Sequence, residues 1–258
     1  MRILLVVGLS VLLTACGSFH PRNPSWRKPL QAAAAPMGET APSPLRWKEI
    51  GTSVQGRSIR TVTLGTGPRK VLWVGGIHGD EREGSHATAS LPRAFRESPG
   101  AMDKVTLTIL EDINPDGTAL GVRWNANGVD LNRNYPAANF QASRRFGSTP
   151  LNQPESKVLH DLILELGPDL VIVAHSWRGD HFINFDGPAE HLAERFSKLS
   201  EYRVQPSDEI APTPGSLGSW VGREKKIPIL TLEYLRGRDP VVAWNETREA
   251  ILAVILEG

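Results

Sequence analysis

Five short apolar runs, separated by segments long enough for helices, constrain the fold of this chain more than any other feature. The runs are bounded by glycine, proline or charged residues, and they read KVLWVGGI (70–77), KVTLTILEDI (104–113), DLVIVAHS (169–176), HFINFDG (181–187) and IPILTLEYL (227–235). Continuous apolar runs of this length are typical of central strands that are covered on both faces. They predict the strands of a buried sheet.

The segments between and after these runs favour helices, and the most regular are Ser85–Arg96, Pro154–Leu166, Pro188–Leu199 and Pro240–Leu256. A strand pair with a turn at Gly56 precedes them, within residues 45–65. Strands that alternate with helices predict an α/β fold with a mostly parallel sheet. At 258 residues with 40% hydrophobic content, the chain can bury a core as one domain, and no internal repeat is present.

The N-terminus, MRILLVVGLSVLLTACGS, has one positive charge, an apolar stretch too short to span a bilayer, and small residues before a cysteine. It resembles a bacterial lipoprotein signal, which implies a signal peptide over residues 1–15 and lipidation of Cys16. The alternative is an ordinary signal peptide with an incidental cysteine. Cys16 is the only cysteine, as suits an oxidising compartment. Because Gly17 follows instead of aspartate, we expect a cell-envelope lipoprotein on the periplasmic face of the outer membrane.

Residues 16–44 are rich in proline and alanine and show no periodic apolar face, so they predict a tether between the lipid and a domain over residues 45–258. The formal net charge is +1, from 29 Lys and Arg against 28 Asp and Glu. A chain with so little net charge has no global field for nucleic acid, and we expect no nucleic-acid partner.

Four polar residues fall where predicted strands end. His78 and Glu81 follow the first apolar run, and His175 and Glu233 lie at the ends of DLVIVAHS and IPILTLEYL. In open α/β sheets, ligands bind outside the carboxyl ends of the strands. Segments far apart in sequence therefore deliver chemistry to one edge, which predicts an active site there.

Two imidazoles and one carboxylate from His78, Glu81 and His175 form the donor set of hydrolytic zinc. Such a set holds one Zn²⁺ and leaves an open position for a water of lowered pKa. Softer metals would prefer thiolate, which this set lacks. Taken alone, the His-x-x-Glu pair has another explanation, a surface turn with an acidic residue at a helix start.

Five strings occur in the order of the M14 zinc carboxypeptidase family: GGIHGDEREG, NPDG, NANGVDLNRNYP, VAHS and TLEYL. The likeness runs from about Leu45 to the C-terminus. It implies a three-layer sandwich around a central mixed, mostly parallel twisted sheet. Within the family, the compact layout and PTPGSLGSW are most similar to the murein peptide amidases. Those enzymes cut the γ-D-glutamyl–meso-diaminopimelate bond of cell-wall peptides.

The resemblance implies roles for the residues of the metal site. His78, Glu81 and His175 match the zinc ligands, and Asp130 matches the aspartate that orients a ligand histidine. Glu233 matches the general base that deprotonates the attacking water. The alternatives are an Asx turn for Asp130 and a salt bridge with Arg236 for Glu233.

The resemblance also implies a substrate clamp. Asn132 and Arg133 are both expected to bind the substrate, and Arg133 matches the arginine that pairs with the substrate carboxylate through two parallel hydrogen bonds. Arg123 is placed near the motif and is expected to stabilise the developing oxyanion.

The sequence departs from the digestive carboxypeptidases in the region before Glu233, which lacks their lid tyrosine. We expect Ser216 or Trp220 to contact the substrate there instead. Arg178 and Asp180 are candidates to bind the far amino and carboxyl groups of diaminopimelate, and the alternative for these two is a mutual surface pair.

The sequence thus predicts a lipid-anchored zinc hydrolase that cleaves an amide bond in murein peptides, held on the membrane through Cys16. One alternative is an N-acyl amino acid deacylase of the aspartoacylase or succinylglutamate desuccinylase type. Another is a non-catalytic peptidoglycan-binding lipoprotein, which would be expected to lack a zinc ligand or the general base.

Overall fold

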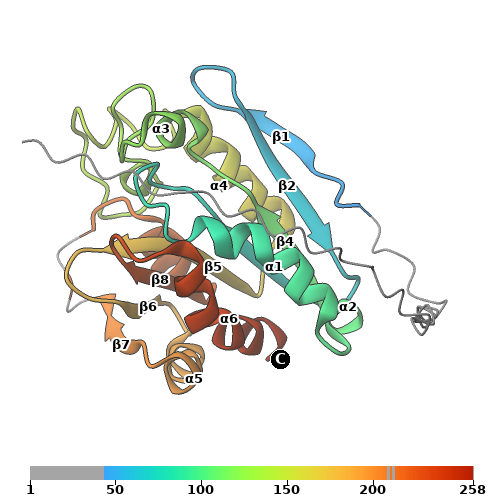
Figure 1. Cartoon of the computed structure of the whole chain (residues 1–258). Helices are drawn as coiled ribbons and strands as arrows, with labels where there is room; N and C mark the ends of the chain where they lie inside the picture. Colours follow the sequence, from blue (N-terminus) through green and yellow to red (C-terminus); the bar gives the residue numbers. More distant parts are fainter. Residues whose placement is uncertain (1–43, 208–209, 211–212, 258) are drawn as a thin grey trace, which may run out of the picture. The chain divides into compact units, whose positions relative to one another are not determined.

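The computed structural model describes residues 44–207, 210 and 213–257, which belong to one compact unit (Figure 1). The predicted signal peptide, Cys16 and the predicted tether up to residue 43 lie outside the described residues. None of the helices in the described part of the chain is both long and apolar enough to cross a membrane.

The described residues form a single eight-stranded sheet with the order β1-β2-β4-β3-β5-β8-β6-β7. Its four central strands, β4, β3, β5 and β8, run parallel, whereas β2 and β6 pair antiparallel to their central neighbours. The strands are β1 (Lys48–Thr52), β2 (Ser58–Leu64), β3 (Arg69–Val74), β4 (Val105–Leu110), β5 (Leu170–Trp177), β6 (Phe182–Asp186), β7 (Arg203–Pro206) and β8 (Ile229–Leu235).

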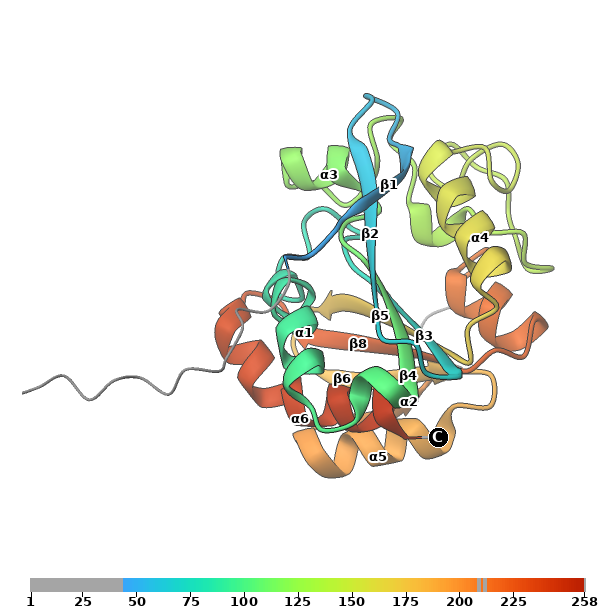
Figure 2. The ribbon, with the colours of Figure 1, turned by 90° about the vertical axis from the view of Figure 1, so that its right-hand side faces the viewer.

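Helices cover both faces of the sheet (Figure 2). One face packs against α1 (Ser85–Glu97), α2 (Ala101–Lys104), α5 (Glu190–Ser200) and α6 (Pro240–Leu256). The other packs against α4 (Pro154–Leu166) and a π-helical segment, Gly218–Glu224. The short helix α3 (Pro115–Leu120) and a 3-10 turn, Leu131–Arg133, lie in the connection between β4 and α4. The three-layer sandwich with a mixed, mostly parallel sheet is therefore confirmed.

The predicted apolar runs correspond to β3, β4, β5, β6 and β8, and the four predicted helices to α1, α4, α5 and α6. Among the described residues, the elements that were not predicted span seven residues or fewer: β7, α2, α3, the 3-10 turn and the π-helical segment. Such segments are too short for a period of 2.0 or 3.6 residues to stand out in the sequence.

The order of the strands places the candidate site residues at one edge of the sheet. β3, β5 and β8 are direct neighbours and run parallel, so their carboxyl ends meet. His175 on β5 is the register partner of Glu233 on β8. Side chains that alternate along paired strands place these two residues on the same face of the sheet.

Candidate metal centre

The loop between β3 and α1 carries two of the candidate ligands, and it is fixed in place by its neighbours. Gly76 has φ of +70°, and a Cβ atom there would meet the Asp112 carboxylate at 2.2 Å, so the turn requires glycine. Arg236, just after β8, donates to the backbone oxygen of Asp80 at 2.8 Å and to its carboxylate at 2.6 Å. Glu83 accepts from the Ser176 hydroxyl and the Gly237 N–H, both at 2.7 Å.

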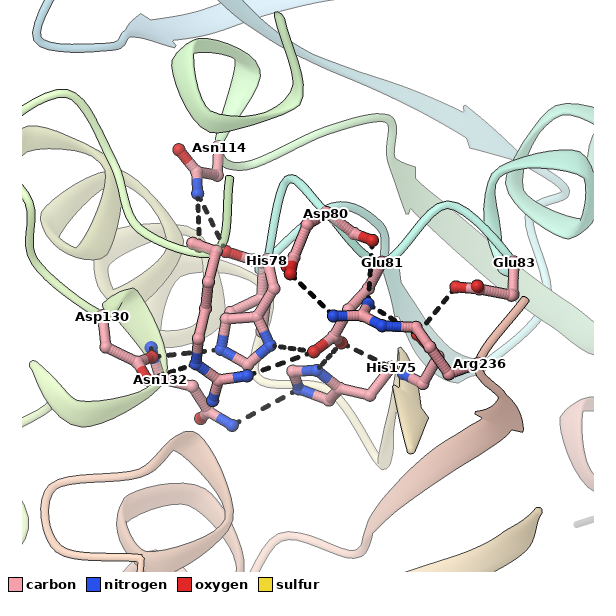
Figure 3. Close-up of polar contacts among 12 residues, drawn as sticks. His78, Asp80, Glu81, Glu83, Asn114, Asp130, Asn132, His175 and Arg236 are labelled. Atoms are coloured by element: carbon pink, nitrogen blue, oxygen red, sulfur yellow. Dashed lines mark hydrogen bonds and ion pairs between the residues drawn. The ribbon is translucent and has the colours of Figure 1, made fainter. Parts of the chain in front are cut away.

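These contacts explain why Asp80 and Glu83, just before helix α1, are acidic. Helix α1 has no acidic residue in its first turn. The two carboxylates instead tie the ligand loop to the ends of β5 and β8, where Figure 3 shows Arg236 bridging the chain segments. The loop therefore presents His78 and Glu81 from a supported position.

Three candidate ligands converge on one point. The Glu81 carboxylate lies between the two imidazoles, 2.9 Å from His78 Nδ1 and 2.9 Å from His175 Nδ1 (Figure 3). The possible ligand atoms of the three side chains all lie within 4.8 Å of one another. All three side chains are almost fully buried, with 3–4% of their surface exposed. The alternative of an isolated His-x-x-Glu surface turn is wrong.

The far nitrogen of each imidazole is held by a different side chain. His78 Nε2 lies 3.0 Å from the Asp130 carboxylate, and His175 Nε2 lies 3.3 Å from the Asn132 amide. The Asn132 side chain is held in turn by the backbone N–H of Leu217, at 2.9 Å. With Nε2 of each ring engaged outward, Nδ1 is the nitrogen that faces the centre.

Asp130 has two roles at once. One of its oxygens faces His78, and the same oxygen accepts from the backbone N–H of Asn132 at 3.0 Å, which is the Asx turn considered from the sequence. Its other oxygen accepts from Arg123 Nε at 2.8 Å. The turn therefore aims the carboxylate at the ligand histidine.

The close packing of these side chains shifts the pKa values of the three candidate ligands. Burial disfavours ionisation, but the neighbouring imidazoles outweigh it and hold the pKa of Glu81 well below its usual range. Burial likewise opposes the charged imidazolium of His78, yet the carboxylates of Glu81 and Asp130 raise its pKa to about 9. For His175, burial is the largest effect and lowers the pKa.

The donor set fits one Zn²⁺. Two imidazole nitrogens and one carboxylate are the ligands of a catalytic zinc site that keeps one position open. Their possible ligand atoms lie within 4.8 Å of one another, which is the arrangement expected where a divalent ion would bind between them. His78, Glu81 and His175 would hold the ion.

Glu233 lines the pocket beside these ligands. Within the described residues its carboxylate accepts no hydrogen bond, and Arg236 bonds to Asp80 and Ser176 instead. The proposed salt bridge between Glu233 and Arg236 is therefore wrong. Burial, together with the nearby charge of Glu81, raises the pKa of Glu233 to about 8. A half-buried carboxylate that accepts no hydrogen bond from its neighbours is free to accept a proton and to return it.

Two arginines line the same pocket. Arg123 Nη1 donates to Glu81 at 3.2 Å while its Nε holds Asp130, so its guanidinium borders the metal centre. Arg133 Nη1 donates to the carbonyl of Asn132 at 2.7 Å, and the other guanidinium nitrogens of Arg133 have no hydrogen-bond partner in the part of the chain described. Burial lowers the pKa of Arg133, which marks a desolvated cation that an incoming anion would stabilise.

The remaining candidates divide into two groups. Ser216 is buried and lines the pocket. Trp220 does not, because it is 2% exposed and stacks on Tyr135 and His160 in the core beneath the pocket. The expected contact between Trp220 and the substrate is therefore wrong: its place in the π-helical segment turns it inward.

Arg178 and Asp180 are also not among the side chains that line the pocket. Asp180 pairs with Arg203 Nε at 2.9 Å, so the mutual pair between Arg178 and Asp180 is not formed either. Both lie in the exposed turn after β5, beyond the edge of the sheet. Their expected contact with the substrate is not supported by this geometry.

Several residues of the pocket lining were not predicted as site residues, and Asn184, Asp186, Ser207 and Thr231 are among them. A signal existed in HFINFDG, where Asn184 and Asp186 are two residues apart and so share a face of the strand. Which face they occupy depends on the antiparallel pairing of β6 with β8, and no local pattern reveals that pairing.

Replacing Asp130 by asparagine is expected to lower the zinc affinity by about 10–100-fold, because the amide keeps the turn but loses the charge that orients His78. Competition with a chelating dye measures the affinity. The exposed Asp161→Asn on α4 is the matched control and should match the unmodified protein. An unchanged affinity in Asp130→Asn would show that this contact does not tune the ligand.

Two imidazoles and a carboxylate beside an unpaired, half-buried glutamate, at the carboxyl edge of an α/β sheet, define a mononuclear metallohydrolase. The zinc carboxypeptidase (M14 peptidase) family model matches residues 31–237. The chain belongs to the M14 zinc carboxypeptidase family, and it is a murein peptide amidase-like metallopeptidase and a hydrolase that uses zinc.

The relatives agree with this assignment. Murein peptide amidase A of Escherichia coli (strain K12) is 30% identical over 203 residues, which cover 70% of this chain and 75% of the relative. The crystal structure of murein-tripeptide amidase from Escherichia coli O157 superposes with a TM-score of 0.70 at 26% identity, over 83% of this chain and 93% of that one. Carboxypeptidase A from Helicoverpa armigera shares the fold, with a TM-score of 0.72 at 20% identity over 81% and 67% of the two chains.

Proposed function

We propose that this chain hydrolyses the amide bond between γ-D-glutamate and meso-diaminopimelate in murein peptides. The similarity to murein peptide amidases supports this substrate class. So does the pocket, whose lining contains no tyrosine among the described residues: Tyr135, Tyr202 and Tyr234 are all buried. A site without the tyrosine lid of the digestive enzymes suits a substrate other than an ordinary C-terminal residue.

Each pocket side chain has a role in this reaction. Bound zinc supplies a Lewis acid that polarises the scissile carbonyl and lowers the pKa of water. Glu233 accepts the proton of the attacking water and returns it to the leaving amine nitrogen. Arg123 stabilises the negative charge that develops on the carbonyl oxygen. Arg133 pairs with the carboxylate of the leaving residue and fixes its orientation.

One observation carries the proposal. The carboxylate of Glu233, free of hydrogen bonds among the described residues, shares a pocket with the three ligand side chains and with Arg133. A base, a metal site and a carboxylate clamp in one pocket are the parts that amide hydrolysis next to a terminal carboxylate requires. A non-catalytic binding module would need none of this arrangement.

The test uses purified zinc-loaded protein and the tripeptide L-Ala-γ-D-Glu-meso-diaminopimelate, with mass spectrometry of the products. We expect release of free diaminopimelate, at least about tenfold faster than from the α-linked isomer. N-acetylaspartate and N-succinylglutamate are incubated in parallel. Turnover of these acylated amino acids in place of the tripeptide would establish the deacylase alternative, and no turnover of any substrate would contradict the proposed function.

We also propose that the protein acts in the cell envelope, held through a lipid on Cys16 with its domain on the periplasmic face of the outer membrane. The support is the sequence alone: an apolar leader that ends in Leu-Thr-Ala-Cys, followed by Gly17. The full-length chain should fractionate with the outer membrane, and Cys16→Ser should be released into the soluble fraction. Equal partition of the two proteins would contradict the anchor.

A further inference from the structure

The NPDG string (114–117) lies next to the metal centre but supplies neither a ligand nor a side chain of the pocket. Its first residue, Asn114, is the N-cap of α3 and is 0% exposed. Burial of an amide costs free energy unless the amide is hydrogen-bonded. The partners of Asn114 therefore indicate what the residue does.

The Asn114 amide uses both of its N–H donors on backbone carbonyls. Its Nδ2 donates to the Ile77 carbonyl at 3.1 Å and to the Arg123 carbonyl at 3.2 Å (Figure 3). Its Oδ1 accepts from the Gly117 N–H at 3.0 Å, which fixes the direction in which the amide faces. Two donors and one acceptor on so short a side chain are found only in asparagine.

The two carbonyls belong to different parts of the site. Ile77 directly precedes the candidate ligand His78, and Arg123 carries the guanidinium that borders the metal centre. The backbone N–H of Asn114 also donates to the Gly76 carbonyl, at 3.1 Å. One residue thus holds two consecutive carbonyls of the ligand loop together with the backbone of Arg123.

Two glycines allow this close approach. A Cβ atom on Gly117 would meet Asn114 Nδ2 at 2.5 Å and the Trp124 carbonyl at 2.7 Å. A Cβ atom on Gly79, in the ligand loop, would overlap with the backbone of Gly117. A side chain at either position would push the ligand loop and the Arg123 segment away from α3.

Helix α3 is itself anchored to the sheet. Asp116 is 0% exposed, and it accepts from the Ser53 hydroxyl at 2.8 Å and from the Gln55 N–H at 3.0 Å. Both donors lie in the turn between β1 and β2. Asn114 is therefore a fixed point against which the ligand loop and Arg123 are placed.

We propose that Asn114 is a positioning residue, which sets the distance between the metal-ligand loop and the guanidinium of Arg123. That guanidinium lies 3.2 Å from Glu81 and 2.8 Å from Asp130, so a shift of its backbone changes both contacts. A displacement of about 1 Å can cost roughly 10²-fold in rate even when the mutated residue is away from the chemistry. This inference rests on the proposed function in one respect, the role of Arg123 at the developing oxyanion.

Asn114→Ser tests this role. Serine keeps an oxygen for the N-cap of α3, adds no charge and removes both amide donors. We expect the zinc affinity to fall about tenfold, because the ligand loop loses its bond at Ile77. We expect kcat on the murein tripeptide, expressed per bound zinc, to fall about tenfold as Arg123 moves. Competition with a chelating dye measures the affinity.

A double-mutant cycle with Arg123→Gln separates positioning from general damage to the fold. Arg123→Gln should itself lower kcat by about 10²-fold. In that background, Asn114→Ser should lower kcat by less than about twofold, because no guanidinium is left to misplace. The loss of zinc affinity should persist, since it arises at Ile77. Damage spread through the fold would instead lower kcat by the same factor in both backgrounds.

Ser200→Ala on α5 is the control. It removes a buried hydroxyl that donates to the Phe196 carbonyl at 2.8 Å and does not line the pocket, so zinc affinity and kcat should match the parent even if the protein melts at a lower temperature. Two results would overturn the proposal: parent-like kcat in Asn114→Ser, or the same loss of kcat with and without the Arg123 guanidinium. Where Asn114→Ser proves too unstable, Asn114→Asp keeps the shape of the side chain and carries the same cycle.

Zinc affinity keeps this inference separate from the scissile bond. If the unmodified protein does not cleave the tripeptide but Asn114→Ser binds zinc about tenfold more weakly than Ser200→Ala, the proposed function fails while the hold of Asn114 on the ligand loop stands. If the two variants bind zinc equally well, Asn114 does not hold the ligand loop, whatever bond is cleaved.

Discussion

Glu233→Gln is expected to lower kcat on the murein tripeptide by about 10³-fold while one zinc ion remains bound. The amide fills the same space but cannot take the proton of the attacking water, and general acid–base catalysis contributes about 10²–10⁴-fold. Glu233 is not among the converging ligand side chains, so the metal content should not change. Elemental analysis measures zinc, and product release measures kcat.

The same variant has a second expected effect that checks its folding. In the metal-free protein the pKa of Glu233 is raised to about 8, so the native state binds a proton that the unfolded chain releases at a lower pH. Its contribution therefore lowers the free energy of unfolding as pH rises from about 4.5 to about 8. Glutamine does not ionise, so metal-free Glu233→Gln does not lose stability in this way as pH rises. Its melting temperature should exceed that of the parent at pH 8, and the two melting temperatures should be closest near pH 5.

The matched control is Glu165→Gln, a change of the same chemistry at an exposed position on α4. It should retain the kcat of the parent. Near-full activity in Glu233→Gln would show that another group deprotonates the water. Loss of zinc in that variant would show that Glu233 belongs to the metal ligands.

His175→Ala is expected to remove zinc and activity together. The substitution leaves His78 and Glu81 as the remaining ligands of a site that needs three. The fall in zinc affinity should exceed the roughly 100-fold upper bound expected for Asp130→Asn, because a ligand is lost outright. A chelator should abolish activity in the unmodified protein, and added Zn²⁺ should restore it.

His191→Ala on α5 is the control for this experiment, since its imidazole is exposed and lies outside the pocket. It should bind zinc and turn over substrate as the parent does. If His175→Ala retains stoichiometric zinc, the ion is held elsewhere and the donor set derived from the structure is wrong. Activity that survives chelation in the parent would contradict a zinc-dependent reaction.

Much of this site could be predicted from residues that are close in sequence. The apolar runs gave the strands because burial on both faces demands apolar side chains at every position. His78, Glu81, His175 and Glu233 stood out because polar groups at the ends of such runs have no structural reason to be there. The type of donor side chain and its position at a strand end are local properties, and they were sufficient to predict the metal and the class of reaction.

The tertiary structure decided which groups meet. Asp130 reaches His78 across 52 residues, and Glu81 reaches His175 across 94. Packing alone sets those contacts, and with them the nitrogen that faces the centre and the raised pKa of His78. Packing also turned Trp220 into the core and left Arg178 outside the pocket.

The part of the pocket that is lined by Asn184 and Asp186 could not be predicted from the sequence for the same reason. Asp186 lies on the same face of the sheet as Thr231 and Glu233 only because β6 pairs antiparallel with β8. A shift of one residue in that pairing would turn Asp186 to the opposite face of the sheet. The sequence by itself determined the strands, the donors and the chemistry of the centre, since these follow from side-chain type and short-range pattern. Only the folded sheet decided which side chains bond to each other, which nitrogen of each ligand histidine faces the centre, and which residues line the pocket. The reason is that strand order and register depend on contacts between residues far apart in the chain.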